Sequence, residues 1–102
     1  MKIRLCGTGE VDDGAMLQVK VEGQAPFAVY NVDGMFFVTE DTCTHGKASL
    51  ADEGVLEGHI VTCGWHDGKF DIRTGEPCAM PCNVPIQTFA ASVEDNAVFV
   101  DV

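Results

Sequence analysis

Apolar and polar residues alternate with a period of two along most of the chain, and turn-forming residues separate the alternating stretches. This pattern predicts short β-strands. The predicted strands span residues 2–6, 16–21, 27–32, 35–39, 59–62, 69–72, 84–90 and 97–101. No stretch keeps a helical period, apart from room for one short turn at 48–52. The sequence therefore predicts an all-β domain of short antiparallel strands, built as a small barrel or sandwich.

The turn signals agree with this pattern. Asp33-Gly34 separates two predicted strands by two residues, and a type I′ turn favours these residues because both positions need positive φ. Arg73-Thr74-Gly75 and Glu94-Asp95-Asn96 supply further turns. The segment 76–85 contains three prolines and is predicted to be a loop. With 102 residues and no linker, the chain is expected to form a single domain over 1–102.

Charge narrows the range of partners. Sixteen acidic and six basic residues leave a net charge of −10, which disfavours nucleic acid and anionic membrane surfaces. The acidity either steers encounters with basic protein patches or only maintains solubility. No apolar run approaches the length of a membrane span, and the first twenty residues do not resemble a signal peptide. A cytoplasmic protein is expected, in which five cysteines indicate metal ligands and buried thiols rather than disulfides.

Two short segments carry matching chemistry. The first holds Cys43 and His45, and the second holds Cys63 and His66, each at a point where a predicted strand ends. Nearby glycines allow sharp turns and a close approach of the backbone to a bulky inorganic group. Two thiolates and two imidazoles can bind a structural zinc ion. The mixed pair in each loop instead suits a two-iron, two-sulfide cluster, in which one iron takes two thiolates and the other two imidazoles.

These two stretches, EDTCTHGKASLADEGVLEG and CGWHDGKFDIRTGEP, resemble the cluster-binding segments of Rieske-type ferredoxins. The likeness is greatest to the small ferredoxins of bacterial aromatic-ring-hydroxylating dioxygenase systems, and it extends to the C-terminal VEDNAVFVDV. It implies one [2Fe-2S] cluster, held by Cys43 and Cys63 on an inner iron and by His45 and His66 on an outer iron. It also implies a Rieske fold with a cluster-binding subdomain at about 41–85.

The resemblance also bears on the reduction potential. High-potential relatives have a disulfide between the loops, where this chain has Ala48 and Trp65. They also direct a serine and a tyrosine hydroxyl at the cluster sulfurs, where this chain has Gly68 and Phe70. Hydrogen bonds to sulfur stabilise the reduced form, so their absence lowers the potential. We expect a midpoint of roughly −200 to −50 mV, near the lower end of the Rieske range.

Other residues near the loops have weaker signals. Gly64 departs from the proline that is frequent in relatives, which predicts a more flexible loop, and Trp65 is expected to pack over the cluster rather than contact a partner. Pro77, Pro81 and Pro85 resemble a loop that shields the cluster. The remaining assignments are listed here: Cys78 and Cys82 as buried or idle thiols rather than a disulfide or second metal site, Cys6 in the core, His59 on a strand surface, and Lys47, Asp67, Asp41 and Glu53 on a docking face.

The chain offers little for catalysis. With two histidines assigned to the cluster, only His59 remains, so a mononuclear iron triad cannot form, and no nucleotide-binding fingerprint is present. The resemblance implies a monomeric electron carrier between a flavin-containing ferredoxin reductase and a terminal Rieske oxygenase. Three alternatives stay open: a structural zinc-binding module, a small Rieske-like subunit of a nitrite reductase, and a redox-sensing interaction protein.

Overall fold

Three antiparallel sheets make up the computed structural model, which describes residues 1–44, 48–64, 68–80 and 84–102. The first sheet has the order β1 (Lys2–Gly7), β11 (Ala97–Asp101), β10 (Ala91–Glu94). The second has the order β2 (Met16–Val19), β3 (Phe27–Val32), β4 (Met35–Glu40), β9 (Thr88–Phe89). The third has the order β5 (Val55–Glu57), β6 (Ile60–Thr62), β7 (Lys69–Asp71), β8 (Pro77–Ala79). A short 3-10 helix η1 (Thr8–Glu10) and a helix α1 (Leu50–Glu53) complete the described elements.

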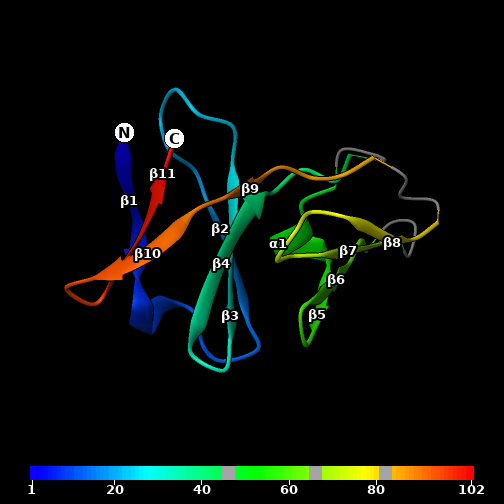
Figure 1. The fold of residues 1–102 in the computed structure, drawn as a ribbon, viewed down its shortest axis with the longest axis horizontal. Coiled ribbons are helices and arrows are strands. Elements are labelled where there is room, and N and C mark those ends of the chain that lie inside the picture. The colour runs from blue at the N-terminus through cyan, green and yellow to red at the C-terminus, as the bar shows by residue number, and fades with distance from the viewer. Residues whose placement is uncertain (45–47, 65–67, 81–83) are drawn as a thin grey trace.

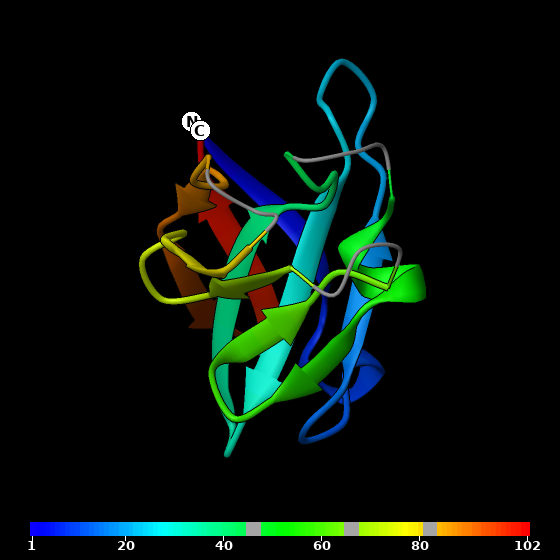
Figure 2. The same ribbon diagram turned by 90° about the vertical axis from the view of Figure 1, so that its right-hand side faces the viewer.

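The second sheet lies between the other two (Figure 1). All six residues of β3 are buried, and their alternation divides them between two cores. Phe27 and Val29 join the core shared with the first sheet. Ala28, Tyr30 and Val32 join the core shared with the third sheet and α1. The chain termini lie together at the first sheet, and the third sheet extends to the other end of the molecule (Figures 1 and 2).

The prediction of an all-β fold is confirmed, and so are the strongest turn signals. Asp33 and Gly34 have φ angles of 53° and 83°, as a type I′ hairpin between β3 and β4 requires. Asp95 and Asn96 form the corresponding turn between β10 and β11, with φ angles of 50° and 60°. These turns depend on residues that tolerate positive φ, and local sequence was sufficient to find them.

The predicted strand at 84–90 is wrong. Only Thr88 and Phe89 pair with β4, and a separate strand begins at Ala91. Pro85 has no backbone N–H to donate, and the N–H of Ile86 donates to the carbonyl of Gly75 at 2.9 Å instead of to a ladder. Three strands were missed, β5, β8 and β10, each of four residues or fewer.

The short turn expected at 48–52 is a helix at Leu50–Glu53. Ser49 caps it by accepting a hydrogen bond from the N–H of Asp52 at 3.1 Å. The N–H of Gly54 donates to the carbonyl of Leu50 at 2.9 Å and closes the single turn. Neither helix in the described ranges has the length and apolarity needed to span a bilayer.

Candidate metal centre

Two loops of the same construction project from the second and third sheets. In the first loop, Thr42 and Ser49 form an isolated antiparallel bridge, and the N–H of Cys43 donates to the carbonyl of Ala48 at 3.0 Å. In the second loop, β6 and β7 pair up to the residues beside Cys63, whose N–H donates to the carbonyl of Gly68 at 2.7 Å. Each cysteine therefore occupies the first position of a loop that is closed five residues later.

The two cysteines lie in one buried cluster. Cys43 and Cys63 are 1 % and 0 % exposed, and both belong to the core between the second and third sheets, which also contains Phe70 and Leu50. Burial would suit thiolates that bind an inner metal ion away from water. The structure thus brings together the two predicted sulfur ligands, and the donor set fits a Rieske cluster.

The two predicted imidazole ligands, His45 and His66, lie outside the described residues, and their role stays a prediction. The other assignments outside the described residues are Lys47, Trp65, Asp67, Pro81 and Cys82. Among the residues that are described, no three histidine, cysteine, aspartate or glutamate side chains gather in a further metal site.

A third loop, the proline-containing segment 76–85, lies beside the first. β8 pairs with β7, so part of the proline-containing segment predicted as a loop is a strand. The hydroxyl of Thr44 donates to the carbonyl of Val84 at 2.7 Å and thereby joins the first loop to the third. Met80 and Val84 are 75 % and 53 % exposed. Two large apolar side chains therefore face solvent on the segment that is tied to the first loop.

Gly64 shows how tightly the second loop packs on α1. A Cβ atom at this position would lie 1.8 Å from the backbone oxygen of Glu53. A Cβ atom at Gly54 would lie 2.4 Å from the carbonyl oxygen of Leu50 and 2.8 Å from that of Thr62. Both contacts involve backbone, which cannot rotate away. The absence of side chains at these two glycines lets the end of α1 lie against the second loop.

The docking-face prediction is wrong for Asp41. This residue is 1 % exposed, and its carboxylate points inward to hydrogen-bond donors. Glu53, in contrast, is exposed at the end of α1, as that prediction requires. Residue type alone does not distinguish the two positions, because an acidic residue near a loop can face either way.

The structure also describes the third histidine and two of the cysteines that are not proposed as ligands. His59 lies in the turn between β5 and β6 rather than on a strand, and it is half-buried with its ring edge-on to Phe37 at 5.5 Å. Cys6 is buried, as expected, and burial raises the pKa of its thiol. Cys78 is exposed rather than buried, and its thiol donates weakly to the carbonyl of Glu76 at 3.6 Å.

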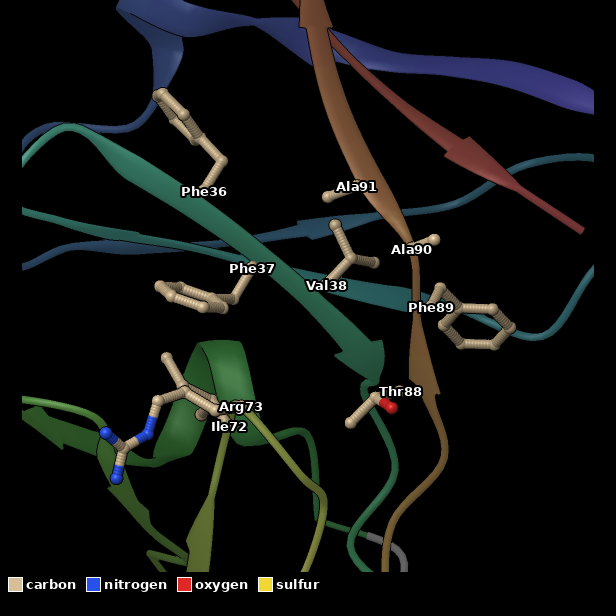
Figure 3. A pocket seen from close by; sticks show the side chains of 9 residues that line it. All are labelled: Phe36, Phe37, Val38, Ile72, Arg73, Thr88, Phe89, Ala90 and Ala91. Atoms are coloured by element: carbon tan, nitrogen blue, oxygen red, sulfur yellow. The ribbon is translucent and has the colours of Figure 1, made fainter.

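A cavity of about 340 Å³ lies apart from the two cysteines, between the second sheet and the β7–β8 connection (Figure 3). Its lining is aromatic and aliphatic, and Arg73 is its one charged residue. The guanidinium of Arg73 is paired with Asp71 at 2.8 Å, a hydrogen-bonded contact that lowers the pKa of that carboxyl. Among the described residues that line the cavity, Thr88 is the one hydroxyl and no acid–base pair accompanies it, so these residues form no catalytic constellation.

Comparisons with known proteins show the family of this chain. Residues 1–90 match the family of Rieske [2Fe-2S] domains, and the chain belongs to that family. It is 48 % identical to the ferredoxin component of a p-cumate 2,3-dioxygenase system from Pseudomonas putida, over 98 % of this chain and 85 % of that protein. The solved structure of a ferredoxin from Sphingomonas yanoikuyae B1 has a TM-score of 0.95 and 46 % identity, with 100 % of this chain and 99 % of that chain covered.

A second solved structure is a complex of reduced oxygenase and oxidised ferredoxin in carbazole 1,9a-dioxygenase. It has a TM-score of 0.91 and 40 % identity, and covers 97 % of this chain and 91 % of that chain. The protein is thus a Rieske electron carrier with one [2Fe-2S] cluster, and not itself a catalytic enzyme. A nitrite reductase small subunit shares the fold at a TM-score of 0.82, but at 20 % identity over 100 % of this chain and 99 % of that chain it supports the architecture alone.

Proposed function

We propose that this ferredoxin accepts single electrons from a flavin-containing NAD(P)H reductase and delivers them to a terminal ring-hydroxylating oxygenase. The observation that carries the proposal is the pair of identically closed loops with their buried cysteines. Similarity to ferredoxin components of aromatic dioxygenase systems supports the choice of partners. The protein is proposed to work as a cytoplasmic monomer that docks transiently.

The proposed ligands are Cys43, His45, Cys63 and His66, within a cluster-binding subdomain at about 41–85. When bound, a Rieske cluster takes up and releases one electron at a time. Cys43 and Cys63 would hold the sheltered side of this group, because both lie in the core. The histidines would hold the side toward the partner. The third sheet, α1 and the third loop fall within this range and would support the two loops that carry the proposed ligands.

The proposed docking surface is the end of the molecule that carries the loops. Met80 and Val84 provide exposed apolar area there, and such area suits the centre of a transient protein–protein contact. The net charge of −10 adds long-range steering toward a basic patch on a partner. Apolar contact and electrostatic steering together fit a protein that must bind two partners in turn and leave each quickly.

Spectroscopy of the purified protein tests the proposed function. We expect about two iron and two acid-labile sulfide atoms per chain, which is the content of one [2Fe-2S] cluster. Dithionite should bleach the visible absorption and produce the rhombic EPR signal of a reduced Rieske centre. Redox titration should place the midpoint below zero. Colourless protein that contains zinc without sulfide would favour the structural zinc module, and a midpoint above zero would contradict the potential argued from the missing donors.

A single hydroxyl should raise the potential. Phe70 is fully buried in the same cluster as both cysteines, at the position where high-potential relatives have tyrosine. In Phe70→Tyr the added hydroxyl can donate to a cluster sulfur, a hydrogen bond that strengthens on reduction. We expect the midpoint to rise on the order of 50 mV, close to a tenfold change in the equilibrium constant. Phe36→Tyr, in the other core, is the control and should leave the midpoint unchanged. Equal midpoints in the two variants would contradict this expectation.

A further inference from the structure

Asp41 is a buried carboxylate at the start of the first loop, and three groups donate hydrogen bonds to it. The side-chain amide of Gln18 on β2 donates to Oδ2 at 2.7 Å. The hydroxyl of Ser49 donates to the same oxygen at 2.6 Å, and the N–H of Ala51 in α1 donates to Oδ1 at 2.9 Å. The hydroxyl of Ser49 also accepts from the N–H of Asp52, so its proton is available to Asp41. The side chain therefore acts as an acceptor throughout, as an ionised carboxylate does.

The backbone of Asp41 is fixed as firmly as its side chain. Its N–H donates to the carbonyl of Pro26 at 3.0 Å, and its carbonyl accepts from the N–H of Leu50 at 2.8 Å. The side-chain and backbone contacts of Asp41 together join three parts of the chain. These are β2, the end of β4 before the first loop, and the residues that follow the loop. A buried carboxylate is costly unless it is fully hydrogen-bonded, so a satisfied one holds its donors in a defined arrangement.

We propose that Asp41 is a positioning residue for the proposed cluster: it fixes the first loop on the base of the fold, and its buried charge lowers the reduction potential. The inference rests on the proposed ligation by Cys43. Asp41 is two residues from that cysteine, so their Cα atoms are at most about 7 Å apart. A charge in the interior is weakly screened, and a nearby anion opposes the uptake of an electron. The low potential is then due to this carboxylate as well as to the absent hydroxyl donors.

Redox titration of Asp41→Asn in the cluster-loaded protein tests the charge. Asparagine keeps the shape and removes the negative charge. We expect the equilibrium constant for reduction to rise about tenfold, which is 59 mV for one electron. Asp52→Asn is the matched control, because Asp52 is a neighbouring acidic residue that is exposed to water. Its removal should change the constant by less than threefold, since solvent screens it. Equal midpoints in the two variants would overturn the claim that the charge of Asp41 lowers the reduction potential.

A second variant tests the positioning and decides the matter if Asp41→Asn does not fold. Gln18→Leu leaves the carboxylate in place and removes the donor from β2. We expect the cluster to be lost at least threefold faster on incubation with a chelator, with a changed EPR line shape. Gln24→Leu, at an exposed glutamine, should match the wild type. A wild-type cluster lifetime and line shape in Gln18→Leu would overturn the positioning role. Absence of a cluster from the wild-type protein would instead refute the proposed function.

Discussion

Gly64→Ala is expected to abolish stable cluster binding. The new Cβ would lie 1.8 Å from the backbone oxygen of Glu53 and 2.7 Å from its carbonyl carbon. Neither atom can rotate away, so either α1 or the second loop has to move. Overpacking of this kind costs about 3 kcal/mol, and the displacement falls directly beside Cys63. Gly64→Pro should have the same effect, even though proline is the residue that many relatives are expected to have here.

The measurement combines iron and sulfide content per chain with urea unfolding. We expect Gly64→Ala to retain less than about a tenth of the wild-type cluster content and to lose about 3 kcal/mol of unfolding free energy. Gly9→Ala is the control, because no atom lies within 4 Å of a Cβ built there and its backbone is not in the left-handed region. That variant should stay within about 0.5 kcal/mol of the wild type. Normal cluster content in Gly64→Ala would show that α1 and the second loop are not held as described.

Gly64 also shows where sequence reasoning reaches its limit. Its spacing from Cys63 and His66 was sufficient to mark a tight loop near a proposed metal ligand. The reason for glycine is a contact with Glu53, eleven positions earlier in the chain, and only the folded structure brings the two together. A prediction of greater flexibility, drawn from the missing proline, had no access to that contact. A position can require glycine either for its conformational freedom or because a side chain would collide with a neighbouring segment.

Elements specified locally were predicted well. The hairpin at Asp33-Gly34 depends on the φ preferences of two residues, and β3 on a run of six buried positions. In contrast, β8 at Pro77–Ala79 is a strand only because β7 lies beside it. Its proline and its short length indicate a loop when they are considered alone. The period-two pattern of one segment does not show which neighbouring strand it pairs with.

The candidate site divides in the same way. Cys43 and Cys63 were identified by residue type and spacing, and the structure places both in one buried cluster. The residues that support them were missed or misplaced. Asp41 was predicted at the surface although it is buried, and the link from Thr44 to Val84 had no signal. Chemically distinctive ligands leave a pattern in sequence, whereas supporting residues are defined by the neighbours that folding gives them.

The two hydrophobic cores of the molecule should contribute differently to stability and to the environment of the cluster. This difference predicts a second large effect of mutation. One core joins the first and second sheets, and it contains Phe27. The other joins the second and third sheets, and it contains Phe70 with both proposed cysteine ligands. Both phenylalanines are essentially inaccessible to solvent. Stability should therefore depend on both cores, and the cluster environment on the second alone.

Truncation of each phenylalanine distinguishes the contribution of a core to stability from its influence on the cluster. Phe70→Ala and Phe27→Ala should each lower the unfolding free energy by about 3–5 kcal/mol, a large part of the 5–15 kcal/mol typical of a domain. Phe70→Ala leaves a cavity beside Cys43 and Cys63, so the folded fraction should also show a shifted visible spectrum and EPR signal. Phe27→Ala should leave both spectra unchanged at equal cost in stability. If the two variants had the same spectra after correction for unfolding, the core around Phe70 would have no influence on the cluster, and the placement of the proposed site against it would be wrong.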